Sequence, residues 1–455
     1  MKQLLYTISA LAVLATTACR KYVEISPVNV RQLKYTKDYQ GLLYNSSQVM
    51  EKTYLYPLYA SDEVWTADGA VWQTNLNINA GYAFCWLPKI WTETQEDQDW
   101  ASQYTIIYNT NIVVNEVMGS EGGTDADKHK AYAEALVHRA YAYYTLVNSY
   151  AKQYDSTTAA TDPGVPVVLQ TNFTASLKRV SVEGVYNQII SDLQTALPNL
   201  AATPDVNTNP SQAAVYAILS RVYLNKRDFT KAGLYADSTL QLKNTLVDLN
   251  AYVAAPTTYP NKSNDPETIL SKVVSNFVST LPLSNEAVNL FDPVNDLRYT
   301  LFTKAGADIP VSNFTNRGTY KHRLANQGIY VGPKVPEMML IKAECEARAG
   351  NTASAVNILN ALRRKRLTTT GYTDLTAADA QQALQLVITE RRKELMGTGA
   401  RWFDQRRLQK DNLIATVSRP FKGVTYTLAP GSNEYTFAIA DKYILLNPEI
   451  EQNPR

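Results

Sequence analysis

Carboxylates and arginines are gathered in one stretch near the C-terminal end of the chain, where acid–base chemistry would first be sought. The run Glu390-Arg391-Arg392-Lys393-Glu394 is followed by Asp404. A glycosidase needs two carboxyl groups that face each other across a cleft. Here each carboxylate stands beside arginines on an expected helix, and this spacing favours ion pairs at i, i+3 and i+4 over a raised catalytic pKa. We therefore expect a protein that is not an enzyme.

Other catalytic and cofactor-binding signatures are absent from the sequence. The three histidines are not paired at metal-ligand spacing, and no HExxH, GxSxG, GxxxxGK[ST] or GxGxxG motif occurs. Cys85 and Cys345 are too far apart in the sequence for zinc-ligand spacing. Both are expected to be buried as small hydrophobic side chains. The sequence therefore predicts no metal and no cofactor.

Aromatic side chains offer another means of binding a ligand. The chain has 30 tyrosines against 10 phenylalanines and 6 tryptophans, and four of the tryptophans fall within residues 53–91. Aromatic rings in loops stack on sugar rings or on a partner, or they pin the loop to the helical body, and both interpretations stay open. The candidate ligand contacts are Trp65, Trp72, Tyr82, Trp86, Tyr299 and Tyr320.

The charge balance limits the class of ligand. The chain of 455 residues has 44 basic and 42 acidic side chains, a formal net charge of +2. A protein that follows nucleic-acid phosphates carries a basic domain, so nucleic acid is not expected as a partner. A content of 45% hydrophobic and 19% charged residues also excludes a disordered chain. Near-neutral charge is consistent with stacking on a neutral ligand.

The N-terminal residues indicate export. Met1-Lys2 precedes a short apolar run from Leu4 to Val13, and small residues lead up to Cys19. This pattern is typical of a secretory signal, and the run is too short to span a bilayer. The small residues before Cys19 resemble a bacterial lipobox, in which this cysteine becomes the lipidated first residue after residues 1–18 are removed. An ordinary signal peptide cut near Ala18 is the alternative.

Helical periodicity predicts the architecture. In the segment 209–242, alanines at facing positions flank a polar turn at Lys226-Arg227-Asp228, as in a tetratricopeptide-like hairpin. The segment 334–366 repeats the pattern around Gly350-Asn351. Four such helix pairs would stack into a right-handed superhelix with little β-structure, so the fold is predicted to be mainly α. The four pairs are expected at 124–200, 209–242, 334–366 and 376–409, with long irregular ligand-side insertions at 53–91 and 243–333.

Several motifs follow one another in a characteristic order. The sequence ALVHRAYAYYTLVNSY at 135–150 is followed by a V-Y-x-x-I-x-x-D-L pattern within 179–197 and by a D-x-R turn at Asp296. Near the C-terminus stand ERRKEL at 390–395, RWFDQRR at 401–407 and the ending NPEIEQNPR. Earlier in the chain, Trp100, Tyr104, Ile107 and Asn111 form a W-x3-Y-x2-I-x3-N pattern. This series resembles the SusD/RagB family of outer-membrane nutrient-binding lipoproteins from the Bacteroidetes.

The resemblance implies a function and a location. It implies a single SusD-like domain over 19–455, lipid-anchored at the surface of the outer membrane. Such a protein captures oligosaccharide and passes it to a TonB-dependent SusC-like barrel. Two other functions stay open: a peptide- or protein-binding uptake component of the RagB type, and a tetratricopeptide scaffold without a transport role. Burial of the loop tryptophans together with the absence of an aromatic cleft would favour the scaffold.

Replacement of single loop tryptophans separates ligand contact from packing. If Trp65 and Trp72 contact ligand, Trp65→Ala or Trp72→Ala should weaken binding and leave the melting temperature nearly unchanged. Titration calorimetry and thermal unfolding measure the two effects. A large loss of stability would instead make these rings part of the core.

Overall fold

The computed structural model describes residues 33–172, 176–274, 280–309, 314–321 and 328–454. The expected signal peptide and Cys19 lie outside these ranges. Within them, helices predominate and the strands form only two-stranded sheets, which confirms a mainly α fold with little β-structure. In this part of the chain, no helix has both the length and the apolar character needed to cross a membrane.

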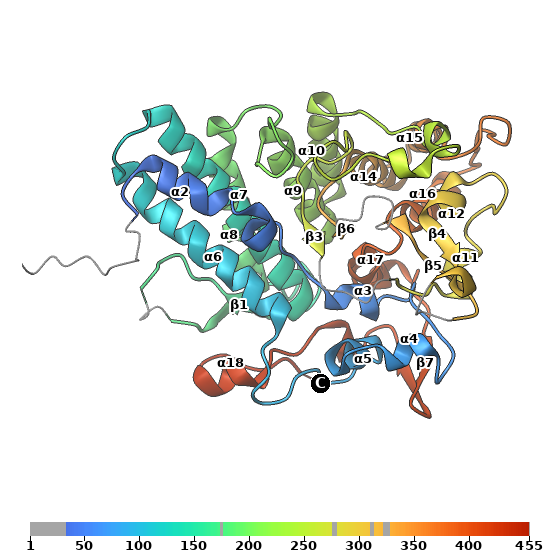
Figure 1. Cartoon of the computed structure of the whole chain (residues 1–455), viewed down its shortest axis with the longest axis horizontal. Coiled ribbons are helices and arrows are strands. Elements are labelled where there is room, and N and C mark those ends of the chain that lie inside the picture. The colour runs from blue at the N-terminus through green and yellow to red at the C-terminus, as the bar shows by residue number, and fades with distance from the viewer. Residues whose placement is uncertain (1–32, 173–175, 275–279, 310–313, 322–327, 455) are drawn as a thin grey trace, which may run out of the picture.

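The first helix pair is built around α7 (Asp125–Tyr150). This helix begins at Thr124, whose side chain and that of Asp127 form a capping box. It packs against α8 (Val182–Ala196), as the sequence predicted, and also against α6 (Gln98–Glu116). Figure 1 shows the three helices side by side at the N-terminal end of the molecule. Helix α6 thus extends the predicted pair to a three-helix layer.

The next two pairs are the hairpins that the repeat pattern predicted. Helices α9 (Gln212–Asn225) and α10 (Phe229–Leu242) pack against each other, as do α14 (Val335–Arg348) and α15 (Thr352–Arg363). Helix α10 also contacts α14, so the two hairpins are neighbours although 92 residues separate them in sequence. Stacking of consecutive pairs buries a continuous core, as expected for a repeat architecture.

The two helices of the fourth predicted pair pack on different parts of the chain and do not form a hairpin like the other pairs. Helix α16 (Ala380–Glu394) packs on α14 and α15, whereas α17 (Ala400–Leu408) packs against the short helix α3 (Tyr56–Ala60). Gly397 and Gly399, both at positive φ, separate the two helices. This turn directs α17 toward the segment 53–91 (Figure 1).

The insertions contain short elements where the sequence predicted irregular structure. The segment 53–91 forms α3, α4 (Val71–Thr74) and α5 (Ile78–Phe84) and is largely buried. The segment 243–333 carries short helices and strands, and its strand β4 (Thr303–Ala305) pairs with β5 (Arg317–Thr319). Its described part also contains β3 (Val273–Val274), α11 (Asn285–Val288), α12 (Leu297–Phe302), β6 (Ile329–Tyr330) and three short 3-10 helices at Leu249–Tyr252, Pro256–Thr258 and Gly306–Asp308. Outside the insertions lie α2 (Thr36–Leu43), β1 (Pro163–Pro166), β2 (Arg179–Ser181), β7 (Val417–Phe421), β8 (Val424–Leu428) and α18 (Asp441–Leu446).

The charged run on α16 and α17 forms buried ion pairs. Asp404 accepts hydrogen bonds from Arg391 and from Arg407, each at 2.7 Å, and Arg407 also pairs with Glu344 of α14 at 2.6 Å. Burial favours the neutral acid, but the two guanidinium groups outweigh it and lower the pKa of Asp404 to about 2. The predicted ion pairing is confirmed, and several partners come from other elements as well as from the same helix.

The carboxylates at the C-terminal end of α16 are likewise buried and paired with arginines. Arg298 of α12 pairs with Glu390 at 2.6 Å and with Glu394 at 3.0 Å, and Arg366 pairs with Glu394 at 2.9 Å. Burial opposes ionisation of both carboxyl groups, yet the neighbouring cations lower the pKa of each to about 2. These groups are therefore ionised and paired at neutral pH.

Removal of one member of this ion-pair network should lower the free energy of unfolding. Arg407→Leu leaves Glu344 and Asp404 buried with fewer partners, so we expect the free energy of unfolding to fall by about 3–5 kcal/mol. Denaturant titration followed by circular dichroism measures the change. The matched control is Arg364→Leu, which breaks an exposed pair with Asp374 and should cost less than about 1 kcal/mol. Equal effects of the two variants would contradict a structural role for the buried network.

Candidate ligand pocket

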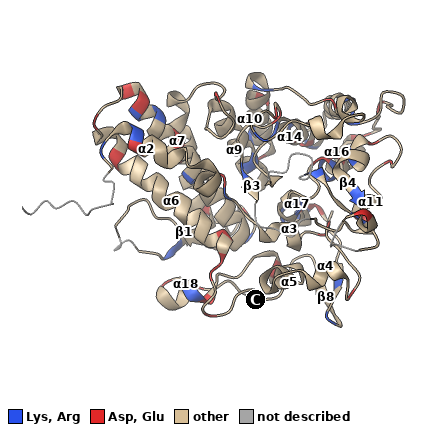
Figure 2. Ribbon diagram, in the orientation of Figure 1, with Lys and Arg blue, Asp and Glu red and all other residues tan. Residues whose placement is uncertain are grey.

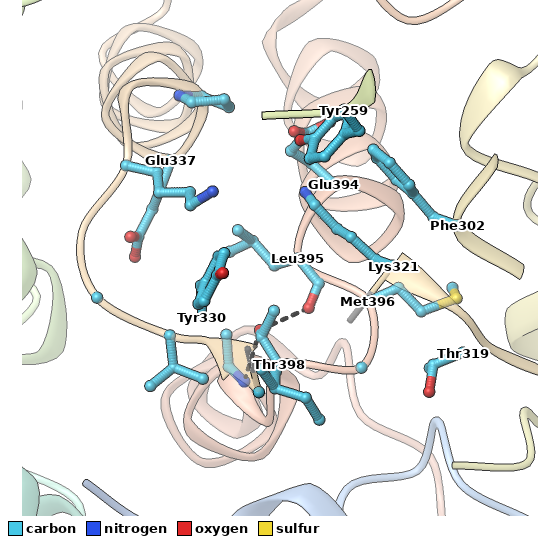
Figure 3. A pocket seen from close by; sticks show the side chains of 18 of the residues that line it. Tyr259, Phe302, Thr319, Lys321, Tyr330, Glu337, Glu394, Leu395, Met396 and Thr398 are labelled. Carbon is cyan, nitrogen blue, oxygen red and sulfur yellow. Dashed lines mark hydrogen bonds between the residues drawn. The ribbon is translucent and has the colours of Figure 1, made fainter. Parts of the chain in front are cut away.

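A pocket with about 860 Å³ of empty space, part of it open to solvent, lies beside the insertion 243–333. Residues from this insertion form one side, and the start of α14 with the α16–α17 connection forms the other (Figure 3). Residues on its wall such as Phe302, Tyr330 and Met396 are partly exposed, so the pocket reaches the surface.

Aromatic rings form the wall on the insertion side. Tyr259 and Phe302 meet edge to face with their ring centroids 5.5 Å apart, and Tyr330 lies on another part of the wall. Phe302 is placed by α12, which begins at the N-cap residue Asp296 and is fixed to α16 through Arg298. The buried ion network therefore holds one of the pocket's aromatic rings in position.

The α16–α17 connection forms the opposite part of the lining. Leu395, Met396 and Thr398 face the pocket, and the Thr398 hydroxyl donates to the Leu395 carbonyl at 2.6 Å (Figure 3). Gly397 has φ +72°, and a Cβ there would lie 2.4 Å from Cγ2 of Thr319. Only glycine lets this connection pass so close to β5. The Gly397 amide also donates to Glu63 at 3.1 Å, which ties the connection to the segment 53–91.

Charged side chains line the pocket, and most of them are neutralised by partners. Arg221 donates to Glu337 at 2.9 Å, Lys334 pairs with Asp265, and Glu394 is held by arginines as described above. Lys321 lies with its ammonium nitrogen 4.3 Å from the centroid of the Phe302 ring. Within the described ranges, no cluster of three or more His, Cys, Asp or Glu side chains is arranged to hold a metal ion.

Two family models match the chain, one on each side of the insertion. The model described as "Starch-binding associating with outer membrane" matches residues 23–224, and the model described as "SusD family" matches residues 335–455. The second match contains the ion-paired helices α16 and α17, and the first contains α6 to α9. The chain belongs to the SusD/RagB family.

Solved structures share the fold of this SusD/RagB protein over nearly its whole length. A SusD superfamily protein from Bacteroides thetaiotaomicron has a TM-score of 0.75 at 19% identity, covering 92% of this chain and 100% of its own. A putative sugar-binding protein from Bacteroides vulgatus has a TM-score of 0.73 at 20% identity, covering 93% and 99%. A laminarin-binding SusD-like protein has a TM-score of 0.68 at 17% identity, covering 93% and 100%.

A curated relative is similar over a shorter stretch. SusD-like protein P38 of Formosa agariphila is 27% identical over 122 residues, which are 26% of this chain. The match spans only 22% of the length of that relative. The family models show the family, and the solved structures show the fold.

Two of the predicted contact residues lie in the core of this SusD/RagB protein. Trp72 is fully buried and donates from Nε1 to the Thr280 carbonyl at 2.7 Å. Trp86 is also buried, donates to the Ala60 carbonyl at 2.8 Å, and has the Arg419 guanidinium 4.3 Å from its ring centroid. For these two tryptophans the geometry favours the packing role that the sequence left open, because neither offers a free face to a ligand.

The remaining predicted contacts are partly exposed and lie outside the pocket wall. The Trp65 amide donates to the Pro282 carbonyl at 3.1 Å, and the Leu283 amide donates to the Arg317 carbonyl at 2.8 Å, so Trp65 is joined to β5 through this strand-like segment. The guanidinium carbon of Arg317 lies over the ring of Tyr299, 3.9 Å from its centroid. The ammonium nitrogen of Lys304 lies 5.2 Å from the centroid of the Tyr320 ring. Tyr82, on α5, packs against the core. Ligand contact by Trp65, Tyr82, Tyr299 and Tyr320 stays a prediction.

The sequence marked the region that builds the pocket wall but missed its residues. Tyr259, Phe302, Lys321 and Tyr330 all belong to the segment 243–333, which was predicted to be on the ligand side. Their separation in sequence follows no period. The fold brings Tyr259 against Phe302 and places the Lys321 ammonium over the Phe302 ring. A search for aromatic and cationic residues in this insertion would have found them among other candidates.

The burial of Trp72 changes the expected outcome of its replacement. Trp72→Ala removes a fully buried indole and one hydrogen bond, so we expect the free energy of unfolding to fall by about 3–5 kcal/mol. Tyr108→Ala is a matched control, because this ring is 47% exposed on α6, and it should change stability by less than about 0.5 kcal/mol. Denaturant unfolding of both variants measures the difference, and an unchanged stability of Trp72→Ala would contradict the core role.

Proposed function

We propose that this protein is a lipid-anchored component of the outer membrane that captures oligosaccharide at the cell surface and passes it to a TonB-dependent SusC-like barrel. The observation that carries the proposal is the solvent-accessible pocket with an aromatic wall in a chain of the SusD/RagB family. The anchor is assigned to Cys19 on the sequence pattern.

Aromatic and polar groups on the pocket wall support a sugar as the ligand. Tyr330 and Phe302 are partly exposed, so each offers ring surface for stacking on the apolar face of a sugar. Hydroxyl and carbonyl groups of Thr319, Thr398 and Leu395 lie on the same lining. A few polar groups around an apolar wall are the usual composition of a site that fixes the orientation of a small ligand.

The similar proteins support this class of ligand. One solved structure of the same fold is named as laminarin-binding and another as a putative sugar-binding protein. The helical body would serve as the rigid support on which the insertion is held, and its broad surface suits docking on a barrel. Binding of peptide in place of sugar, as in a RagB-type component, is the principal competing outcome.

Replacement of a pocket ring should weaken sugar binding. Tyr330→Ala removes one stacking surface, so we expect about tenfold weaker affinity, equivalent to about 1.4 kcal/mol. The measurement is isothermal titration calorimetry of the purified chain against a panel of neutral and acidic oligosaccharides, followed by titration of the variant with each oligosaccharide that binds.

The control for this experiment is Tyr426→Ala, a partly buried tyrosine of the β7–β8 hairpin outside the pocket. It should keep the affinity of the unmodified protein. If the panel gives no binding while peptides bind, the peptide-uptake function replaces the proposed one. If sugar binds with equal affinity to both variants, the ligand site lies elsewhere on the protein.

A further inference from the structure

Lys321 differs from the other charged residues that line the pocket. The side chains of Arg221, Lys334, Glu337 and Glu394 each have an oppositely charged partner. Among the described residues, no carboxylate lies within 4.0 Å of the Lys321 ammonium, which instead lies over the ring of Phe302. In Figure 3 this side chain runs along the pocket with its nitrogen toward Tyr259 and Glu394. Among the described residues of the pocket lining, Lys321 is therefore the one positive charge without an ion-pair partner.

The surroundings of this ammonium disfavour its charged form. Burial lowers the pKa of Lys321 to about 8, and the nearby cations Lys334 and Arg366 act in the same direction. Glu394 and Glu267 oppose them, but both carboxylates are already held by Arg366. An anion bound beside Lys321 would offset the desolvation of the ammonium, which is the usual way in which a protein holds a charge in a pocket.

We infer that Lys321 recognises a carboxylate on the ligand, and that the captured oligosaccharide contains a uronic acid unit. A single ammonium matches one carboxylate, whereas phosphate groups are commonly held by the fork of an arginine or by several backbone amides. The arginine of the lining, Arg221, is engaged with Glu337. Phe302, which lies beside the ammonium and is partly exposed, supplies a ring surface for the sugar that carries the carboxylate. This inference rests on the proposed function and narrows its ligand class.

The test compares acidic sugars with their neutral counterparts. The probes are D-glucuronate and oligouronates of four to six units, namely oligogalacturonate and oligomannuronate, each compared with the same compound after reduction of its carboxyl groups to alcohols. We expect calorimetry to detect at least one uronate, with the reduced form binding about ten- to hundredfold more weakly, as for loss of a charge-assisted hydrogen bond. Equal affinity for the acidic and the reduced form would overturn the inference.

Substitution of Lys321 tests whether this residue causes the preference for the acidic sugar. Lys321→Met should reduce uronate affinity about ten- to hundredfold and leave the affinity for the reduced sugar unchanged, and Lys321→Arg should restore most of the uronate affinity. The matched control is Lys304→Met, because Lys304 also lies over an aromatic ring, that of Tyr320 at 5.2 Å, but does not line the pocket. Thermal unfolding of each variant shows whether it is folded. Lower uronate affinity in Lys304→Met than in Lys321→Met would overturn the assignment.

The remaining outcomes separate this inference from the proposed function. Binding of neutral oligosaccharides without binding of any uronate would overturn the inference and leave sugar capture intact. Binding of peptides through a Lys321-dependent contact with their C-terminal carboxylate, without binding of sugars, would overturn both.

Discussion

The buried charges of α16 and α17 constrain the rest of the structure. An ionised carboxylate or guanidinium that leaves water must find partners within the protein, because an unpaired buried charge costs several kcal/mol. Asp404 satisfies this requirement with Arg391 and Arg407, and Arg407 reaches Glu344 on α14. The pair of Arg391 with Asp404 joins α16 to α17, and the pair of Arg407 with Glu344 joins α17 to α14, so the network fixes the positions of these three helices relative to one another. Ion pairs of this kind add specificity to an arrangement that apolar contacts alone would leave less defined.

The same constraint connects the helical body to the pocket. Glu394 at the end of α16 is shared by Arg298 and Arg366, and Arg298 belongs to the short helix that ends at Phe302. The residues after Glu394 are those of the pocket lining, Leu395 and Met396. Figure 2 shows charged positions on the ribbon around the labels α16 and β4, which are neighbours in that view. The insertion is thus held at the pocket by buried charges, one of which, Glu394, also lines the pocket.

The tryptophan-rich segment 53–91 is held by a different interaction. The guanidinium of Arg419 is fully buried, lies over the rings of Phe84 and Trp86, and donates to the carbonyls of Tyr59, Phe84 and Ser61. Burial lowers its pKa to about 9. A planar cation between aromatic rings can be kept in the core when backbone carbonyls satisfy its donors. Trp86, which was among the candidate ligand contacts, therefore helps to attach the C-terminal hairpin to this segment.

The sequence by itself determined the long helices of the repeat hairpins and the ion-pair residues of the family motifs, but not the short helices of the two insertions. These features depend on local periodicity and on neighbouring residues, as at the turn Lys226-Arg227-Asp228 between α9 and α10. Tertiary structure alone decided which aromatic rings are buried and which line the pocket. Trp72 and Tyr330 come from insertions without regular periodicity, and their exposure depends on partners more than 50 residues away, such as Thr280 for Trp72. Because contacts between distant segments leave no pattern in the residues around each ring, a single sequence could mark the insertion as the ligand side but could not choose Tyr259, Phe302 and Lys321 within it.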